Sequence, residues 1–160
     1  MGGNFGIATT SGEWWRLGTS IFLHFGVRHL VPNMAVLWFF GRVVERMVGH
    51  RAFFIVYALG GLAGSVTGLI HNYEAVGAGA SCATLGIVGC LLAVLIRKVG
   101  LLPNAQRTRL YELAAATLIL AFLGDLLDGG IGGSHAAGLV TGFVAGVFLP
   151  VPTRKRRHFA

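Results

Sequence analysis

The feature that most constrains this chain is a succession of five long apolar segments that contain few charged residues. Hydrophobic residues make up 54% of the chain and charged residues 12%, whereas soluble domains carry about 25% charged residues. A helix needs about 20 apolar residues to cross the ~30 Å hydrocarbon core of a bilayer. We therefore predict an all-α, polytopic membrane helix bundle that forms a single domain over residues 1–160. Its five transmembrane helices are expected near residues 20–43, 52–71, 81–97, 109–127 and 134–151.

The basic residues predict how these segments are oriented. Of the 13 Lys and Arg residues, all except Arg16 and Arg28 lie between segments one and two, between segments three and four, or at and after the end of segment five. Cytoplasmic loops carry such an excess of positive charge. We therefore expect residues 1–19 to be an external loop, 20–152 the helix bundle and 153–160 a basic cytoplasmic tail. The net charge of +7 is then a topology signal, and we expect no nucleic-acid partner.

The start of the chain and its cysteines give two further expectations. Residues 1–16 contain no apolar stretch of the kind found in signal peptides. An external N-terminus then needs another means of export, so we expect a further spanning segment before Met1. Cys82 and Cys90 are eight positions apart in one segment, too far along a helix to form a bridge, and we expect free thiols.

Ser81 stands at the start of the third segment, within a run of small residues. Residues 81–96 would reach only about 24 Å as a helix, at 1.5 Å per residue, so the start of this helix should lie below the membrane surface. Irregular backbone at that depth must be buried in protein or line a wet cavity. Gly77 and Gly79 suit such a segment because glycine tolerates unusual backbone angles and close packing.

His135 begins the last apolar segment, on the same side of the membrane as Ser81. Ionisable side chains within membrane segments are costly and are usually functional. A serine and a histidine are the minimum for nucleophilic catalysis, in which a base takes the hydroxyl proton. Asp125 and Asp128 lie in the adjoining loop, but we expect neither of them to orient His135. A two-residue Ser81–His135 dyad is the simpler prediction.

Two further polar residues lie near the start of the first segment. His29 and Asn33 are four positions apart, about 40° around a helix, and therefore share a face. His24 is about 140° away from His29 and should not share that face. A metal site here would lack an accompanying acidic residue or cysteine, so we expect no metal and no cofactor.

Two motifs favour particular contacts between helices. Gly138 and Gly142 form a GxxxG motif one turn after His135, which would let segment five pack closely on segment three. Glu45, beside Arg42 and Arg46, is expected to form a structural ion pair at the cytoplasmic end of its helix.

In this order and at these spacings, the motifs resemble the rhomboid family of intramembrane serine proteases, of the bacterial type, over nearly the whole chain. The matching segments are Glu13-Trp-Trp15-Arg16 with the family's Trp-Arg loop motif, His24 to Asn33 with HxxxxHxxxN, Gly41 to Glu45 with Gly-xxx-Glu, Gly79-Ala-Ser81 with GxS, and His135 to Gly142 with HxxGxxxG. The family core has six helices, so this chain would lack the first.

The resemblance implies an activity and a role for each matched residue. Ser81 would be the nucleophile and His135 its general base. The Ser81 backbone N–H and the His29 and Asn33 side chains would form the oxyanion hole, while His24 would hold the loop. The reaction would be hydrolysis of peptide bonds in or near transmembrane segments of membrane-protein substrates. The enzyme would be a multi-pass protein of a bacterial plasma membrane, with its active site facing outside and its C-terminus in the cytoplasm.

Three departures from the family pattern leave alternatives open. Cys82 replaces the glycine that usually follows the serine, Leu85 replaces an aromatic residue expected under the histidine ring, and Pro32 precedes Asn33. A catalytically impaired rhomboid-like protein that binds transmembrane clients without cleaving them is therefore the main alternative. A small transporter or proton relay that uses the intramembrane histidines is a third.

Overall fold

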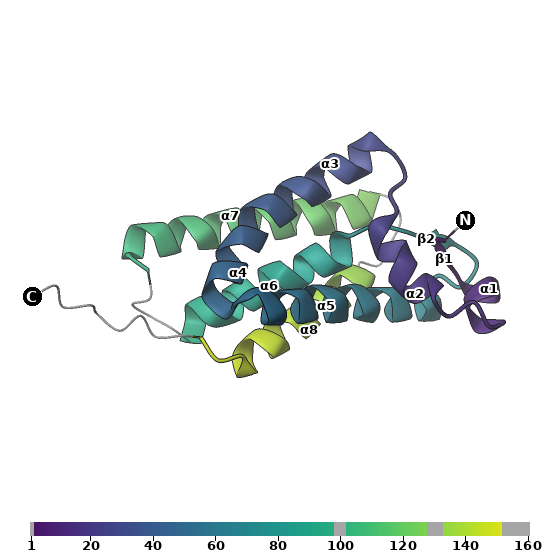
Figure 1. Cartoon of the computed structure of the whole chain (residues 1–160). Helices are drawn as coiled ribbons and strands as arrows, with labels where there is room; N and C mark the ends of the chain where they lie inside the picture. Colours follow the sequence, from purple (N-terminus) through teal and green to yellow (C-terminus); the bar gives the residue numbers. More distant parts are fainter. Residues whose placement is uncertain (1, 98–101, 128–132, 152–160) are drawn as a thin grey trace, which may run out of the picture.

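The protein, seen in a computed structural model that describes residues 2–97, 102–127 and 133–151, is a bundle of helices (Figure 1). This confirms the all-α prediction, apart from one short ladder of two strands. The predicted basic tail at residues 153–160 lies outside the described residues. In chain order the elements are β1 (Asn4–Phe5), α1 (Gly6–Thr10), α2 (Arg16–Thr19), the 3₁₀ helix η1 (Ser20–Phe22), α3 (Val27–Val36), the π-helix η2 (Leu37–Gly41), α4 (Arg42–Val48), α5 (His50–His71), β2 (Val76–Gly77), α6 (Ser81–Arg97), α7 (Asn104–Leu127) and α8 (Gly133–Phe148).

Helices occur at all five predicted positions, and the bounds of α6 agree with the prediction at both ends. The first prediction, 20–43, is wrong at both ends. Gly26 has a φ of +109° and interrupts the chain, so the helix begins at Val27 and continues through α3, η2 and α4 to Val48. Among the described residues, α5 and α7 are long and apolar enough to cross a membrane, whereas α6 and α8 are shorter apolar helices.

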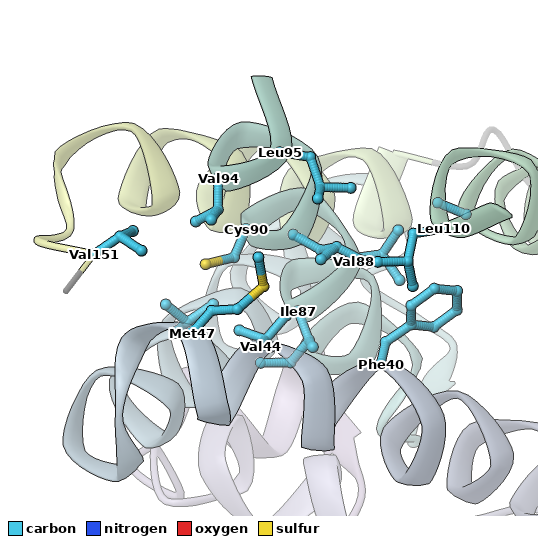
Figure 2. Packing of buried hydrophobic residues seen from close by; sticks show 13 residues of the cluster. Phe40, Val44, Met47, Ile87, Val88, Cys90, Val94, Leu95, Leu110 and Val151 are labelled. Carbon is cyan, nitrogen blue, oxygen red and sulfur yellow. The ribbon is translucent and has the colours of Figure 1, made fainter. Parts of the chain in front are cut away.

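Helix α6 is the centre of the bundle. Of its 17 residues 12 are buried, which explains why its sequence is apolar on all sides rather than along one stripe. Ile87, Val88 and Cys90 of α6 pack among side chains from η2, α4 and α7 (Figure 2). Helix α7, by contrast, buries only Leu110 and Ala114 among its described residues.

Glycines let α8 approach α6 at the level of the backbone. A Cβ atom added to Gly138 would overlap the Cys82 carbonyl, and one added to Gly142 would overlap the Gly86 carbonyl. Gly146 continues the series one turn further on, where a Cβ would lie 2.8 Å from the Cys90 carbonyl oxygen. This is the close packing of segments three and five that the GxxxG spacing predicts.

The segment expected to be an external loop is folded onto the bundle. Strand β1 pairs antiparallel with β2, so that Asn4 lies opposite Gly77, close to the entry to α6. The buried Asn4 side chain donates a hydrogen bond to the Ser65 carbonyl of α5, at 2.8 Å. Arg16 donates hydrogen bonds to the Glu13 carboxylate and to the Gly3 carbonyl. The neighbouring Trp15 side chain is exposed.

The partner predicted for Glu45 is wrong. The Glu45 carboxylate contacts the ring of His50, with 2.5 Å between Oε1 and Nδ1, and not Arg42 or Arg46. Gly49, with a φ of +88°, reverses the chain so that His50 comes back beside Glu45. The Arg42 guanidinium instead lies over the Trp38 ring, 4.8 Å from its centre.

Candidate active site

The loop before Ser81 is held from two sides. The Gly79 N–H donates to the Ser20 carbonyl at 3.0 Å, and the Ala80 N–H points to His24 Nε2 at 3.4 Å. Gly79 has a φ of +135°, and a Cβ there would lie 2.7 Å from His29 Nε2. Only glycine therefore fits this position, both in backbone conformation and in space. Ser81 follows as the first residue of α6.

The structure brings Ser81 and His135 together although 54 positions separate them in the sequence. Ser81 Oγ lies 2.7 Å from His135 Nε2, within normal hydrogen-bond distance. His135 occupies the first turn of α8, and the backbone contact between Gly138 and Cys82 lies one turn below it. The close packing of α6 and α8 thus sets the distance between the hydroxyl and the imidazole.

Asp125 of α7 lies at the other ring nitrogen of His135. Its Oδ2 is 2.7 Å from His135 Nδ1, and the two side chains are only 20% and 19% exposed. We expected neither Asp125 nor Asp128 to orient His135. The structure differs for Asp125, whereas Asp128 lies outside the described residues. Hydropathy predicts that α7 ends at this end of the bundle. It does not predict the rotation of the helix about its axis, so the sequence did not reveal this contact.

His29 and Asn33 line the same cavity as Ser81 and His135, a space of about 380 Å³ between α3, α6 and α7. The Asn33 amide donates to the His29 carbonyl at 2.8 Å, so the start of α3 is held in place by its own side chain. The His29 ring stacks on Phe25 and meets the His24 ring edge-on. His24 precedes the helix, so the expectation that it lies on a different helix face does not apply.

A second cavity, of about 240 Å³, reaches Ser81 and His135 from the side of the N-terminal segment. It is lined by small and polar residues that include Asn4, Ser20 and Ser65. The first cavity is lined more by apolar side chains, among them Val36, Leu85 and Leu120. The Ser81–His135 pair therefore lies between a more polar space and a more apolar one.

The three departures from the family pattern have structural counterparts. Cys82 directs its side chain toward Gly64 of α5, where an added Cβ would overlap the sulfur, so the larger residue on α6 is matched by a smaller one on α5. Leu85 is buried, and the aromatic ring beside His135 is instead Phe122 of α7, edge-on with its centre 6.5 Å away. Pro32 lies inside α3, beyond its first turn, and lines the cavity beside Asn33.

Two expectations concern chemistry at the site. The thiols of Cys82 and Cys90 are free, as predicted. Within residues 2–97, 102–127 and 133–151 no group of three His, Cys, Asp or Glu side chains is arranged to hold a metal ion.

The family model and the similar proteins all point to the same family. The model of the Rhomboid domain matches residues 11–152. The rhomboid protease GluP of Bacillus subtilis strain 168 is 35% identical over 142 residues, which are 88% of this chain and 27% of GluP. YdcA of the same organism is 33% identical over 158 residues, 98% of this chain and 76% of YdcA. RHOMBOID-like protein 6, mitochondrial, of Arabidopsis thaliana is 32% identical over 137 residues, 86% of this chain and 44% of that protein.

The matched region covers the elements that build the candidate site. Residues 11–152 include every helix from α2 to α8, and with them the loop before Ser81, the start of α3 and the first turn of α8. The chain spans only a part of GluP but most of YdcA, so the agreement concerns this helical domain. The chain therefore belongs to the rhomboid family of integral membrane proteins.

Proposed function

We propose that this protein is an intramembrane serine endopeptidase that hydrolyses peptide bonds in or near transmembrane segments of other membrane proteins. The observation that carries the proposal is the 2.7 Å distance between Ser81 Oγ and His135 Nε2, at the meeting point of two cavities. Membership of the rhomboid family and the similarity to the rhomboid protease GluP support the same reaction class.

In this mechanism His135 Nε2 takes the proton of the Ser81 hydroxyl as Oγ attacks the carbonyl carbon of the scissile bond. The protonated imidazole then gives this proton to the leaving amine, and an acyl ester on Ser81 remains. A water molecule, deprotonated by the same ring nitrogen, attacks the ester and releases the carboxylic acid. The Ser81 hydroxyl is regenerated, so the cycle needs no cofactor.

Three donors are available for the negative oxygen that forms in each attack. Ser81 is the first residue of α6, and the first N–H groups of a helix have no partner within it. The positive end of the helix dipole adds to their effect on an anion. The Asn33 amide and the His29 ring line the same cavity and complete the proposed oxyanion hole.

The two cavities suggest separate routes for the two reactants. The more apolar cavity between α3, α6 and α7 would receive the substrate backbone, because the apolar lining of this cavity suits a transmembrane helix. Helix α7 buries few of its described residues, so it would also be the helix that moves most easily to admit a substrate. The second cavity, beside the N-terminal segment, would hold the attacking water, because polar side chains such as Asn4, Ser20 and Ser65 line it. Ser81 begins α6 and Arg97 ends it, so the positive-inside rule would put the active site outside and the C-terminus in the cytoplasm.

A fluorophosphonate probe tests the nucleophile without knowledge of the substrate. We expect labelling of the wild type, loss of labelling in Ser81→Ala and His135→Ala, and normal labelling of the control Ser11→Ala, whose side chain is exposed on the N-terminal segment. Asn33→Ala should slow labelling by about 10²–10³-fold if its amide stabilises the oxyanion.

The outcomes separate the protease from its main alternative. Labelling that persists in Ser81→Ala would refute the assignment of the nucleophile. A wild type that binds transmembrane peptides in liposomes but neither reacts with the probe nor cleaves them would indicate a client-binding protein without catalysis.

A further inference from the structure

The imidazole of His135 is contacted at both nitrogens, and the two contacts come from different helices. Nε2 faces Ser81 Oγ of α6, and Nδ1 faces Asp125 Oδ2 of α7, each at 2.7 Å. A neutral imidazole carries one proton, so the two contacts cannot both be donated by the ring. An ionised carboxylate can only accept, which puts the proton on Nδ1 and leaves the lone pair of Nε2 facing the serine hydroxyl.

We infer that Asp125 is a positioning residue, which fixes the tautomer and the ring orientation of His135 and extends the Ser81–His135 pair to a chain of three groups. The inference rests on the proposed function. As His135 takes the serine proton, the ring becomes a cation, and the adjacent carboxylate stabilises that charge. Asp125 acts through the His135 ring, with which it forms its hydrogen bond, although it also lines the cavity proposed for the substrate.

The surroundings of Asp125 favour this role. Both side chains of the pair are about four-fifths buried, and a charge-assisted hydrogen bond is stronger where water is partly excluded. Within the described part of the chain, Asp125 has no other hydrogen-bond or ion-pair partner than His135. Its carboxylate is therefore not committed to a basic side chain that would explain its burial.

Helix α7 supplies a second contact to the same ring. Phe122 lies three residues before Asp125 on one face of α7, and its ring is perpendicular to the imidazole, at 90°. Phe122 thus limits the tilt of the imidazole while Asp125 limits its rotation. Both of these contacts to the His135 ring come from α7.

The experiment compares Asp125→Asn, Asp125→Ala and Asp125→Glu with the wild type, using Glu74→Gln as the control because Glu74 is an exposed carboxylate outside both cavities. The concentration dependence of fluorophosphonate labelling gives the maximal rate and the half-saturating concentration separately. Two-bond ¹⁵N–¹H spectra of histidine-labelled protein give the tautomer of His135, assigned with His135→Gln.

We expect Asp125→Asn to lower the maximal labelling rate by about 10- to 100-fold, with little change in the half-saturating concentration. The loss should be smaller than at a fully buried triad because this pair is partly exposed. Asp125→Glu, which keeps a carboxylate, should recover part of the rate. The His135 spectrum should change from the Nδ1–H tautomer in the wild type to a mixture or to Nε2–H in Asp125→Asn.

Several results would overturn the inference. One is an unchanged rate in Asp125→Asn. Another is an equal loss of labelling rate in all three variants with the tautomer unchanged. If the thermal unfolding midpoint of these variants is also lowered, Asp125 merely ties α7 to α8. An Nε2–H tautomer in the wild type would also overturn it, and this readout needs no turnover. Failure of the protease proposal looks different, because the wild type and Ser81→Ala would then behave alike with the probe.

Discussion

Gly138 couples the packing of the bundle to the distance between the two proposed catalytic groups. It lies one turn after His135 on α8 and faces the backbone of Cys82, the residue after Ser81. A Cβ atom at Gly138 would overlap the Cys82 carbonyl oxygen and would lie 2.8 Å from its carbon and 2.9 Å from Cα. Backbone atoms cannot rotate away as a side chain can, so Gly138→Ala must push α8 away from α6.

The size of the effect follows from these distances. Ordinary contacts of a Cβ begin at 3.4 Å, so relief of the overlap needs a separation of about 1 Å, and overpacking of this kind costs about 1–3 kcal/mol of stability. The same shift would lengthen the 2.7 Å contact between Ser81 Oγ and His135 Nε2 to about 3.7 Å, beyond hydrogen-bond distance. A misplacement of about 1 Å can reduce a reaction rate ~10²-fold.

The assay measures the unfolding midpoint in detergent and the rate of fluorophosphonate labelling of the same samples. Gly18→Ala is the matched control, because a Cβ at Gly18 of α2 has no atom within 4 Å and Gly18 lines neither cavity. We expect both quantities to fall for Gly138→Ala and neither to fall for Gly18→Ala. Wild-type stability and labelling in Gly138→Ala would show that the close approach of α8 does not set the geometry of the pair.

Two further predictions concern stability. Gly64→Ala should lower the free energy of unfolding by about 1–3 kcal/mol, because the added methyl group meets the Cys82 side chain. Cys82→Gly should restore most of that loss in the double variant, measured by denaturant titration, whereas effects of the two substitutions that simply add would argue against the contact. Asn4→Ala should cost about 1–2 kcal/mol, since it removes the buried bonds to the Ser65 carbonyl and the Thr9 hydroxyl; a thermal midpoint equal to that of the wild type would contradict this.

The site was largely predictable because its parts stand at the ends of apolar segments. Ser81 and His135 begin two such segments, and their placement at one end of the bundle follows from counting the crossings. Asp125 shows the limit of this argument. Its position at the end of α7 was visible in the sequence, but hydropathy does not report the rotation of a helix that buries so few of its residues.

The N-terminal segment illustrates another limit. Its two-residue strand pairs with residues more than 70 positions later, and no local sequence pattern predicts such a short ladder. The error at the start of α3 has a local cause, because the apolar residues from Ile21 to Leu23 belong to a 3₁₀ turn and the loop that carries His24. Apolar composition alone does not distinguish such a turn and loop, in which Phe22 and Leu23 are exposed, from the first turns of a helix.

The sequence by itself determined the number and order of the helical segments and the family motifs with their spacing. These depend on composition and on local periodicity, which a single chain displays directly. The tertiary structure alone decided that Asp125 and Phe122 meet the His135 ring, that His50 pairs with Glu45, and that Cys82 fits beside Gly64. Such contacts depend on the rotation and separation of helices packed against one another, and these are set by the sum of many backbone and side-chain contacts across the bundle.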